Sequence, residues 1–161
     1  MKTLIKNGLV VDPANLVQTH LNLLLEDGKI VAVTEEEPEA DRVIDAAGKV
    51  VAPGFIDIHM HEDPVKDDKI QFCIFDAMLR MGVTTAVGGN CGINVYDPVK
   101  YLDLLERDGA PVNVMMFAGH QYYREAAGAL DKYSPVTEEQ RKMMKKGLEE
   151  ALEAGCVGIS Y

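Results

Sequence analysis

The spacing of apolar and polar residues predicts short β-strands over residues 1–52. Five strands are expected, at Thr3–Val11, Leu21–Leu25, Lys29–Val33, Arg42–Asp45 and Lys49–Val51. The pair Asp27-Gly28 is a strong hairpin signal, because both central positions of a type I′ turn need positive φ. The last two strands are expected to pair with each other across the turn at 46–48. Residues 1–52 are therefore expected to form an all-β segment.

After Pro53 the pattern changes to alternating strands and helices. Strands are expected at Phe55–His59, Val83–Val87, Val112–Ala118 and Cys156–Ser160. Helices are expected at 68–81, 98–107 and 137–154, the last with a capping box of Thr137 and Gln140. This order predicts right-handed βαβ units and a parallel sheet. Because a closed eight-stranded barrel takes about 250 residues, residues 53–161 supply at most half of one.

Composition and charge limit the classes of partner. The chain has 161 residues, of which 47% are apolar, and a formal net charge of −10. This charge argues against binding to nucleic acid or to an anionic membrane, since both favour an excess of Lys and Arg. The three cysteines have no regular spacing, and no signal peptide or long apolar stretch is evident. A soluble cytoplasmic protein is expected, and its oligomeric state is not readable.

The sequence His59-Met60-His61 follows an apolar strand and is the strongest candidate for a metal site. In an extended backbone, side chains at i and i+2 point to the same face, so both imidazoles can reach one ion. Asp57 would lie on that face and could orient a ligand imidazole. The alternative is a pair of buried, hydrogen-bonded histidines. Glu62 and Asp63, which come next, are expected to be exposed loop acids.

Cys91 lies in the glycine-rich segment Gly88–Gly92, directly after the second strand of the alternating region. Parallel-sheet enzymes place their sites at the carboxyl ends of strands, so Cys91 would share an edge with the histidines. Thiolate is a good zinc ligand. The alternative is a small buried apolar residue, which is the expectation for Cys73 and Cys156.

Two further residues follow the third strand of this region. His120 comes after Gly119, where it could contact substrate or take part in a helix cap or a core hydrogen bond. Arg124 lies one helical turn later and could bind a carboxylate. It could equally pair with Glu125 or Asp131.

At these residues the chain resembles the amidohydrolase superfamily, in particular the N-acyl-D-amino-acid deacylases. The superfamily motif is the strand that ends in His-x-His. The more specific subgroup marker is the turn Gly-Asn-Cys-Gly at 89–92. The similarity continues in Gly119-His120 with Arg124, in residues 150–160 and in the N-terminal β segment, so it covers nearly all of the chain.

The resemblance implies a distorted (β/α)8 barrel flanked by a small β-sandwich. Residues 1–52 would be an incomplete segment of the sandwich, and residues 53–161 would supply the first four strands of the barrel and the helices between them. It implies hydrolysis of the N-acyl bond of a small-molecule substrate by water activated at one or two divalent ions, typically zinc. His59 and His61 would bind one ion and Cys91 the neighbouring one. Asn90 would lie in the outer shell or contact substrate. Two further histidines and an aspartate that acts as general base would lie beyond Tyr161.

Two alternatives remain at this stage. The first is a cyclic amide hydrolase of the hydantoinase or dihydroorotase kind. Those relatives usually use a carboxylated lysine on the fourth strand, and residues 158–160 contain none. The second is that the 161-residue chain alone is a catalytically inactive fragment.

Overall fold

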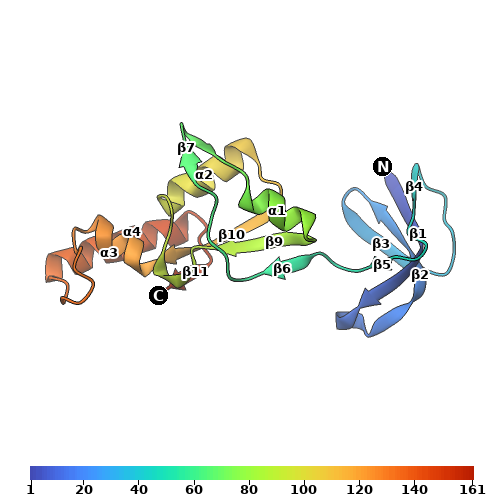
Figure 1. Cartoon of the computed structure of the whole chain (residues 1–161), viewed down its shortest axis with the longest axis horizontal. Helices are drawn as coiled ribbons and strands as arrows, with labels where there is room; N and C mark the ends of the chain where they lie inside the picture. Colours follow the sequence, from blue (N-terminus) through green and yellow to red (C-terminus); the bar gives the residue numbers. More distant parts are fainter. The chain divides into compact units, whose positions relative to one another are not determined.

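The computed structural model describes all residues from 1 to 161. They form two compact units, Met1–Pro53 and Gly54–Tyr161 (Figure 1). None of the helices combines the length and the apolar character needed to cross a membrane.

The first unit is one five-stranded sheet. Its strands are β1 (Lys2–Asp12), β2 (Val17–Glu26), β3 (Lys29–Thr34), β4 (Arg42–Asp45) and β5 (Val50–Val51), and the 3-10 turn η1 (Pro13–Asn15) joins the first two. The order is β3-β2-β1-β4, with β5 also on β1. Asp27 and Gly28 have φ angles of 50° and 78°, which confirms the positive φ predicted at both turn positions.

The predicted pairing of β4 with β5 is wrong, because both strands lie parallel to β1. The turn between them does not reverse the chain. The Ala46 N–H donates to the Lys6 carbonyl and the Leu9 N–H donates to the Lys49 carbonyl, so residues 42–51 follow β1 as one interrupted strand. Strand β1 is eleven residues long, which gives it enough edge to pair with both.

The second unit contains the predicted parallel sheet. Its strands are β6 (Phe55–Asp57), β9 (Val83–Gly88), β10 (Asn113–Gly119) and β11 (Gly158–Ser160), in the order β11-β10-β9-β6. All three pairings are parallel, and the sheet is a curled half-barrel. The helices are α1 (Ile74–Arg80), α2 (Pro98–Asp108), α3 (His120–Ala126) and α4 (Glu138–Glu153). Figure 1 shows α1 beside β9 and α2 beside β10.

The core of this unit lies between the sheet and its helices. Side chains from α1, α2 and α4 pack against the inward residues of β9 and β10, with Phe75, Tyr101 and Met116 almost fully buried. Such burial stabilises the unit by about 25 cal/mol per Å² of apolar surface. The capping box of Thr137 and Gln140 at the start of α4 is confirmed. Helix α3 was not predicted.

The predicted helix at 68–81 begins only at Ile74. Residues before it form a hairpin of β7 (Val65–Lys66) and β8 (Lys69–Ile70). Asp67 and Asp68 have φ angles of 51° and 56°, a type I′ pattern that no helix accommodates.

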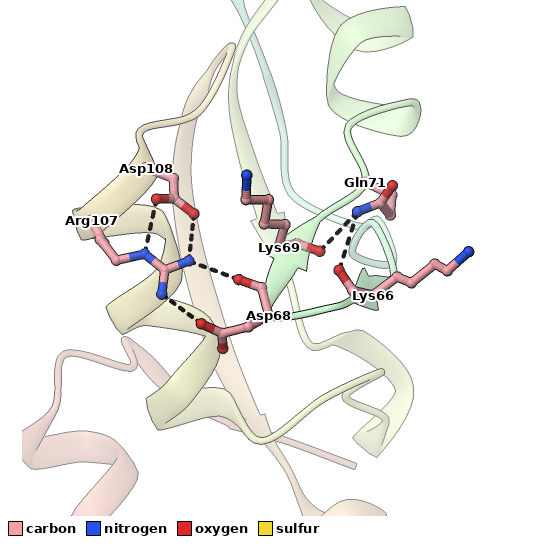
Figure 2. Close-up of polar contacts among 6 residues, drawn as sticks. All are labelled: Lys66, Asp68, Lys69, Gln71, Arg107 and Asp108. Atoms are coloured by element: carbon pink, nitrogen blue, oxygen red, sulfur yellow. Dashed lines mark hydrogen bonds and ion pairs between the residues drawn. The ribbon is translucent and has the colours of Figure 1, made fainter.

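Arg107, near the end of α2, holds the tip of this hairpin (Figure 2). Its guanidinium donates to the Asp68 carboxylate and to the Asp68 carbonyl, both at 2.7 Å, and also binds the neighbouring Asp108. The Gln71 amide donates to the carbonyls of Lys66 and Lys69, the two residues that flank the turn. The apolar residues at 70–81 that predicted one helix therefore belong to a strand and a shorter helix.

Candidate metal centre

His59, His61 and Cys91 converge at the carboxyl edge of the parallel sheet. One ligand atom from each lies within 4.8 Å of the ligand atoms of the other two, and all three side chains are exposed. His59 Nε2 lies 3.3 Å from Cys91 Sγ. Two such ligands on one tetrahedral zinc ion are about 3.5 Å apart, given bonds of about 2.0 and 2.3 Å. The donor set, and the spacing of His59 and Cys91, therefore fit a zinc ion.

The sequence predicted a strand that continues to His59, but β6 ends before both histidines. The strand ends at Asp57, whose Oδ1 accepts the His59 N–H at 3.0 Å and so removes that amide from the ladder with β9. Asp57 orients the turn by binding backbone and is not bonded to an imidazole. Met60 is 7% exposed and its N–H donates to the Val87 carbonyl, so it anchors the segment between the two exposed rings.

Asn90 fixes this histidine segment to the end of β9. Its side-chain amide is buried and donates to the carbonyls of Met60 at 3.3 Å and Val87 at 2.7 Å. The residue therefore connects the two segments that carry the candidate ligands. Its amide makes these hydrogen bonds to backbone and none to the side chains of the three candidate ligands.

Cys91 lies in a tight turn, η2 (Asn90–Gly92), after β9. Its φ of 58° is in the left-handed region, which is unfavourable for a residue with a Cβ. Gly89 precedes it with φ of 73°, and a Cβ there would lie 2.1 Å from the Phe117 carbonyl oxygen. The turn is thus pressed against β10, and the Cys91 thiol faces outward. The alternative of a small buried apolar residue is wrong for Cys91.

Asp63 is fully buried, contrary to the expectation of an exposed loop acid. Its carboxylate caps α1 by accepting the N–H groups of residues 73–75 at 2.7–3.0 Å, together with the Cys73 thiol. The Tyr101 hydroxyl donates to the Asp63 carbonyl at 3.0 Å. Burial raises the pKa of Asp63, but the four donated hydrogen bonds outweigh it, so this pKa lies below its ordinary value.

Glu62 is also buried, at 3% exposed. Its Oε1 accepts from the Asn94 amide at 2.9 Å, and Oε2 has no partner. Asn94 also donates to the Phe117 carbonyl and accepts the Gly119 N–H. This network ties the segment after His61 to the end of β10. Sequence reasoning missed Asn94, and no motif marks it.

Cys73 and Cys156 differ in their surroundings. Cys156 is buried as predicted, and burial raises its pKa to about 11. Cys73 is exposed, contrary to prediction, because the α1 cap places it at the surface. Its hydrogen bond to the Asp63 carboxylate raises the pKa of the Cys73 thiol.

His120 and Arg124 lie outside the cluster of His59, His61 and Cys91. His120 is the first residue of α3, and its ring packs against that of Tyr161 in a tilted arrangement, with 5.4 Å between the ring centroids. It lines an open cavity of about 450 Å³ beside α4, to which none of the three candidate ligands contributes. Arg124 donates to the carbonyls of Asp131 and Ser134, so its guanidinium holds the loop after α3.

Curated relatives share this sequence over nearly its whole length. It is 31% identical to an N-acyl-D-glutamate deacylase and also to a D-aminoacylase of Alcaligenes xylosoxydans xylosoxydans, over 97% and 98% of this chain. It spans only 36% and 37% of the length of those relatives. A dihydroorotase of Elusimicrobium minutum is 43% identical over 53% of the chain and 20% of that protein.

Solved structures agree with these relatives. The N-acyl-D-glutamate deacylase of Bordetella bronchiseptica, in complex with zinc and a phosphonate inhibitor, has a TM-score of 0.82 and 29% identity. A D-aminoacylase mutant in complex with CuCl2 has a TM-score of 0.84 and 28% identity. This chain covers 37% of each, and 98% of it is matched. The amidohydrolase family model matches residues 42–161. The chain therefore belongs to the amidohydrolase family.

Proposed function

We propose that this chain is part of a metal-dependent hydrolase that cleaves the N-acyl bond of an N-acyl-D-amino acid. The observation that carries the proposal is the convergence of two imidazoles and one thiol at the carboxyl edge of the sheet. The family match supports hydrolysis, and the two deacylase relatives, which align over nearly all of the chain, support this substrate class.

His59, His61 and Cys91 would hold one or two divalent ions, with zinc the first choice because it binds both imidazole and thiolate well. Zinc bound there would polarise the amide carbonyl and lower the pKa of a bound water to about 7. The exposure of all three side chains leaves the site open to a substrate. Asn90 and Asp57 would keep the ligand segments in place through their backbone hydrogen bonds.

The 161-residue chain alone would bind metal without turning over substrate. No Asp or Glu belongs to the cluster of His59, His61 and Cys91, so no carboxylate is placed to move a proton between water and the leaving nitrogen. The acids nearest in sequence are already engaged: Asp57 accepts the His59 N–H, and the buried Glu62 accepts from the Asn94 amide. The length of the relatives is consistent with further site residues in a longer protein.

Hydrolysis of a cyclic amide is the second candidate, since the dihydroorotase relative has the higher identity over its shorter match. The fourth strand distinguishes the two. Residues Gly158–Ser160 present a serine at the edge of the sheet, and no lysine that could be carboxylated. This feature favours the deacylase, in which Cys91 would supply the extra ligand.

The test is an amide-release assay on the native gene product, with N-acyl-D-amino acids and dihydroorotate offered separately. We expect turnover of the first group only, complete loss after dialysis against chelator, and recovery on addition of zinc. Undiminished turnover in chelator would refute the metal-dependent mechanism. Turnover of dihydroorotate alone would favour the second candidate. The 161-residue chain, assayed in parallel, should bind zinc and release no product.

A further inference from the structure

Ser160, at the end of β11, contacts the turn that carries Cys91. The Gly92 N–H donates to Ser160 Oγ at 3.0 Å, and the Ser160 hydroxyl in turn donates to the Gly89 carbonyl. One hydroxyl therefore binds the backbone on both sides of Cys91, from a strand that lies 68 and 71 residues further along the chain.

The turn needs such support because its conformation is unfavourable. Gly89, Cys91 and Gly92 all have positive φ, and Cys91 has a Cβ that disfavours this region. On the opposite side, the Asn90 amide binds the segment between His59 and His61. Asn90 thus secures the turn toward the histidines, and Ser160 secures it toward β11.

Only a group that both donates and accepts can make the two contacts of Ser160. A hydroxyl does so, whereas a methyl group would leave the Gly92 N–H without its partner. Ser160 is half-buried, so in a Ser160→Ala variant water could replace the two hydrogen bonds of the hydroxyl only in part.

We propose that Ser160 is a positioning residue that holds the Cys91 sulfur at bonding distance from a metal shared with His59. This inference rests on the proposed metal site. It extends that site to β11, the fourth strand of the parallel sheet, through a hydroxyl that itself binds no metal. Groups that orient metal ligands in this way typically change metal affinity by about 10–100-fold when they are removed.

The test measures cadmium affinity of the full chain through the ultraviolet absorption of the cadmium–thiolate bond. The variants are Ser160→Ala, Ser160→Thr, Cys91→Ala and the double variant of Ser160→Ala with Cys91→Ala. We expect Ser160→Ala to weaken cadmium binding by about 10–100-fold. Ser160→Thr, which keeps the hydroxyl, should remain near the wild-type affinity. In the Cys91→Ala background, Ser160→Ala should change the residual affinity little, because the sulfur to be positioned is absent.

The outcomes separate this inference from the metal site itself. If Cys91→Ala leaves cadmium binding and its thiolate absorption unchanged, the metal site fails and Ser160 has nothing to position. If Cys91→Ala abolishes the absorption but Ser160→Ala matches the wild type, only the role of Ser160 is overturned. An equal loss from Ser160→Ala in both backgrounds would likewise overturn it. Should Ser160→Ala not fold, hydrogen exchange of the Gly92 amide in the wild type decides, and exchange at the rate of an open amide contradicts the proposal.

Discussion

Cys91 Sγ lies 3.3 Å from His59 Nε2, although 32 residues separate the two in sequence. The contact arises because β6 and β9 are adjacent parallel strands and each residue follows the carboxyl end of one of them. A thiol and an imidazole at this distance can share a hydrogen bond or a metal ion. The His61 imidazole lies close to both, and a metal ion, unlike a single hydrogen bond, can bind all three groups at once.

Replacing any one of these three residues should weaken binding of a divalent ion. We expect His59→Ala, His61→Ala and Cys91→Ala each to reduce zinc affinity by at least about 10-fold, because the chain keeps only two of its ligands. Isothermal titration of the chain with zinc measures this. The matched control is His20→Ala, which removes an exposed histidine of the first unit. Equal losses in the control would show that zinc binds non-specifically.

Asn90→Ala should destabilise the second unit by about 1–3 kcal/mol, since the Met60 and Val87 carbonyls each lose the bond from the Asn90 amide and Val87 keeps the weaker one from the Met60 N–H. Zinc affinity should fall as well, because the histidine segment is no longer tied to β9. Urea unfolding and zinc titration provide the two measurements. Asn113→Ala is the control, because Asn113 also donates to a strand carbonyl, that of Thr84, but is exposed. It should cost about 0.5 kcal/mol or less.

Gly89→Ala and Gly128→Ala should differ sharply although both glycines have positive φ, 73° and 75°. A Cβ at Gly128, just after α3, meets no atom within 4 Å, so this change should cost only the backbone strain of about 1–2 kcal/mol. A Cβ at Gly89 would lie 2.1 Å from the Phe117 carbonyl oxygen. It should cost about 3 kcal/mol or more and displace Cys91. Similar unfolding midpoints for the two variants would mean that the turn does not press against β10.

Asp63→Asn should destabilise the chain by about 2–3 kcal/mol at pH 7. Asparagine has one side-chain oxygen, and its NH2 group would face an N–H of α1 that the second carboxylate oxygen now accepts. Asp76→Asn, an exposed acid in the first turn of the same helix, is the control and should cost about 0.5 kcal/mol. Chemical denaturation of both variants shows whether the stability lost in Asp63→Asn comes from the helix cap or only from removing a negative charge near the start of α1.

The difference in stability between the wild type and Asp63→Asn should also depend on pH. The folded-state pKa of Asp63 lies below the ordinary value of 3.8, so its contribution to stability is complete above that value. The contribution is lost as the pH falls through the folded-state pKa. The difference in unfolding free energy between wild type and Asp63→Asn should therefore shrink below about pH 4. A difference that stays constant down to pH 2 would contradict a depressed pKa.

The succession of the four parallel strands and the location of the candidate site could be read from local patterns. Alternating strands and helices predict a parallel sheet, and the carboxyl ends of its strands meet at one edge, which places His59, His61 and Cys91 together. The capping box of α4 and the Asp27-Gly28 hairpin were also readable, since each depends on residues close in sequence.

Contacts between distant segments were decided only by the tertiary structure. Asp63 is buried because α1 begins at Ile74 and needs an acceptor for its first N–H groups, and β4 and β5 pair with β1 because its edge is free. The roles of Asn94 and Ser160 have the same origin: each binds backbone that lies more than 20 residues away. Hydrophobic periodicity and short motifs predict the local secondary structure in which a residue lies. The partner of a buried polar group depends on which chain segments the fold brings beside it.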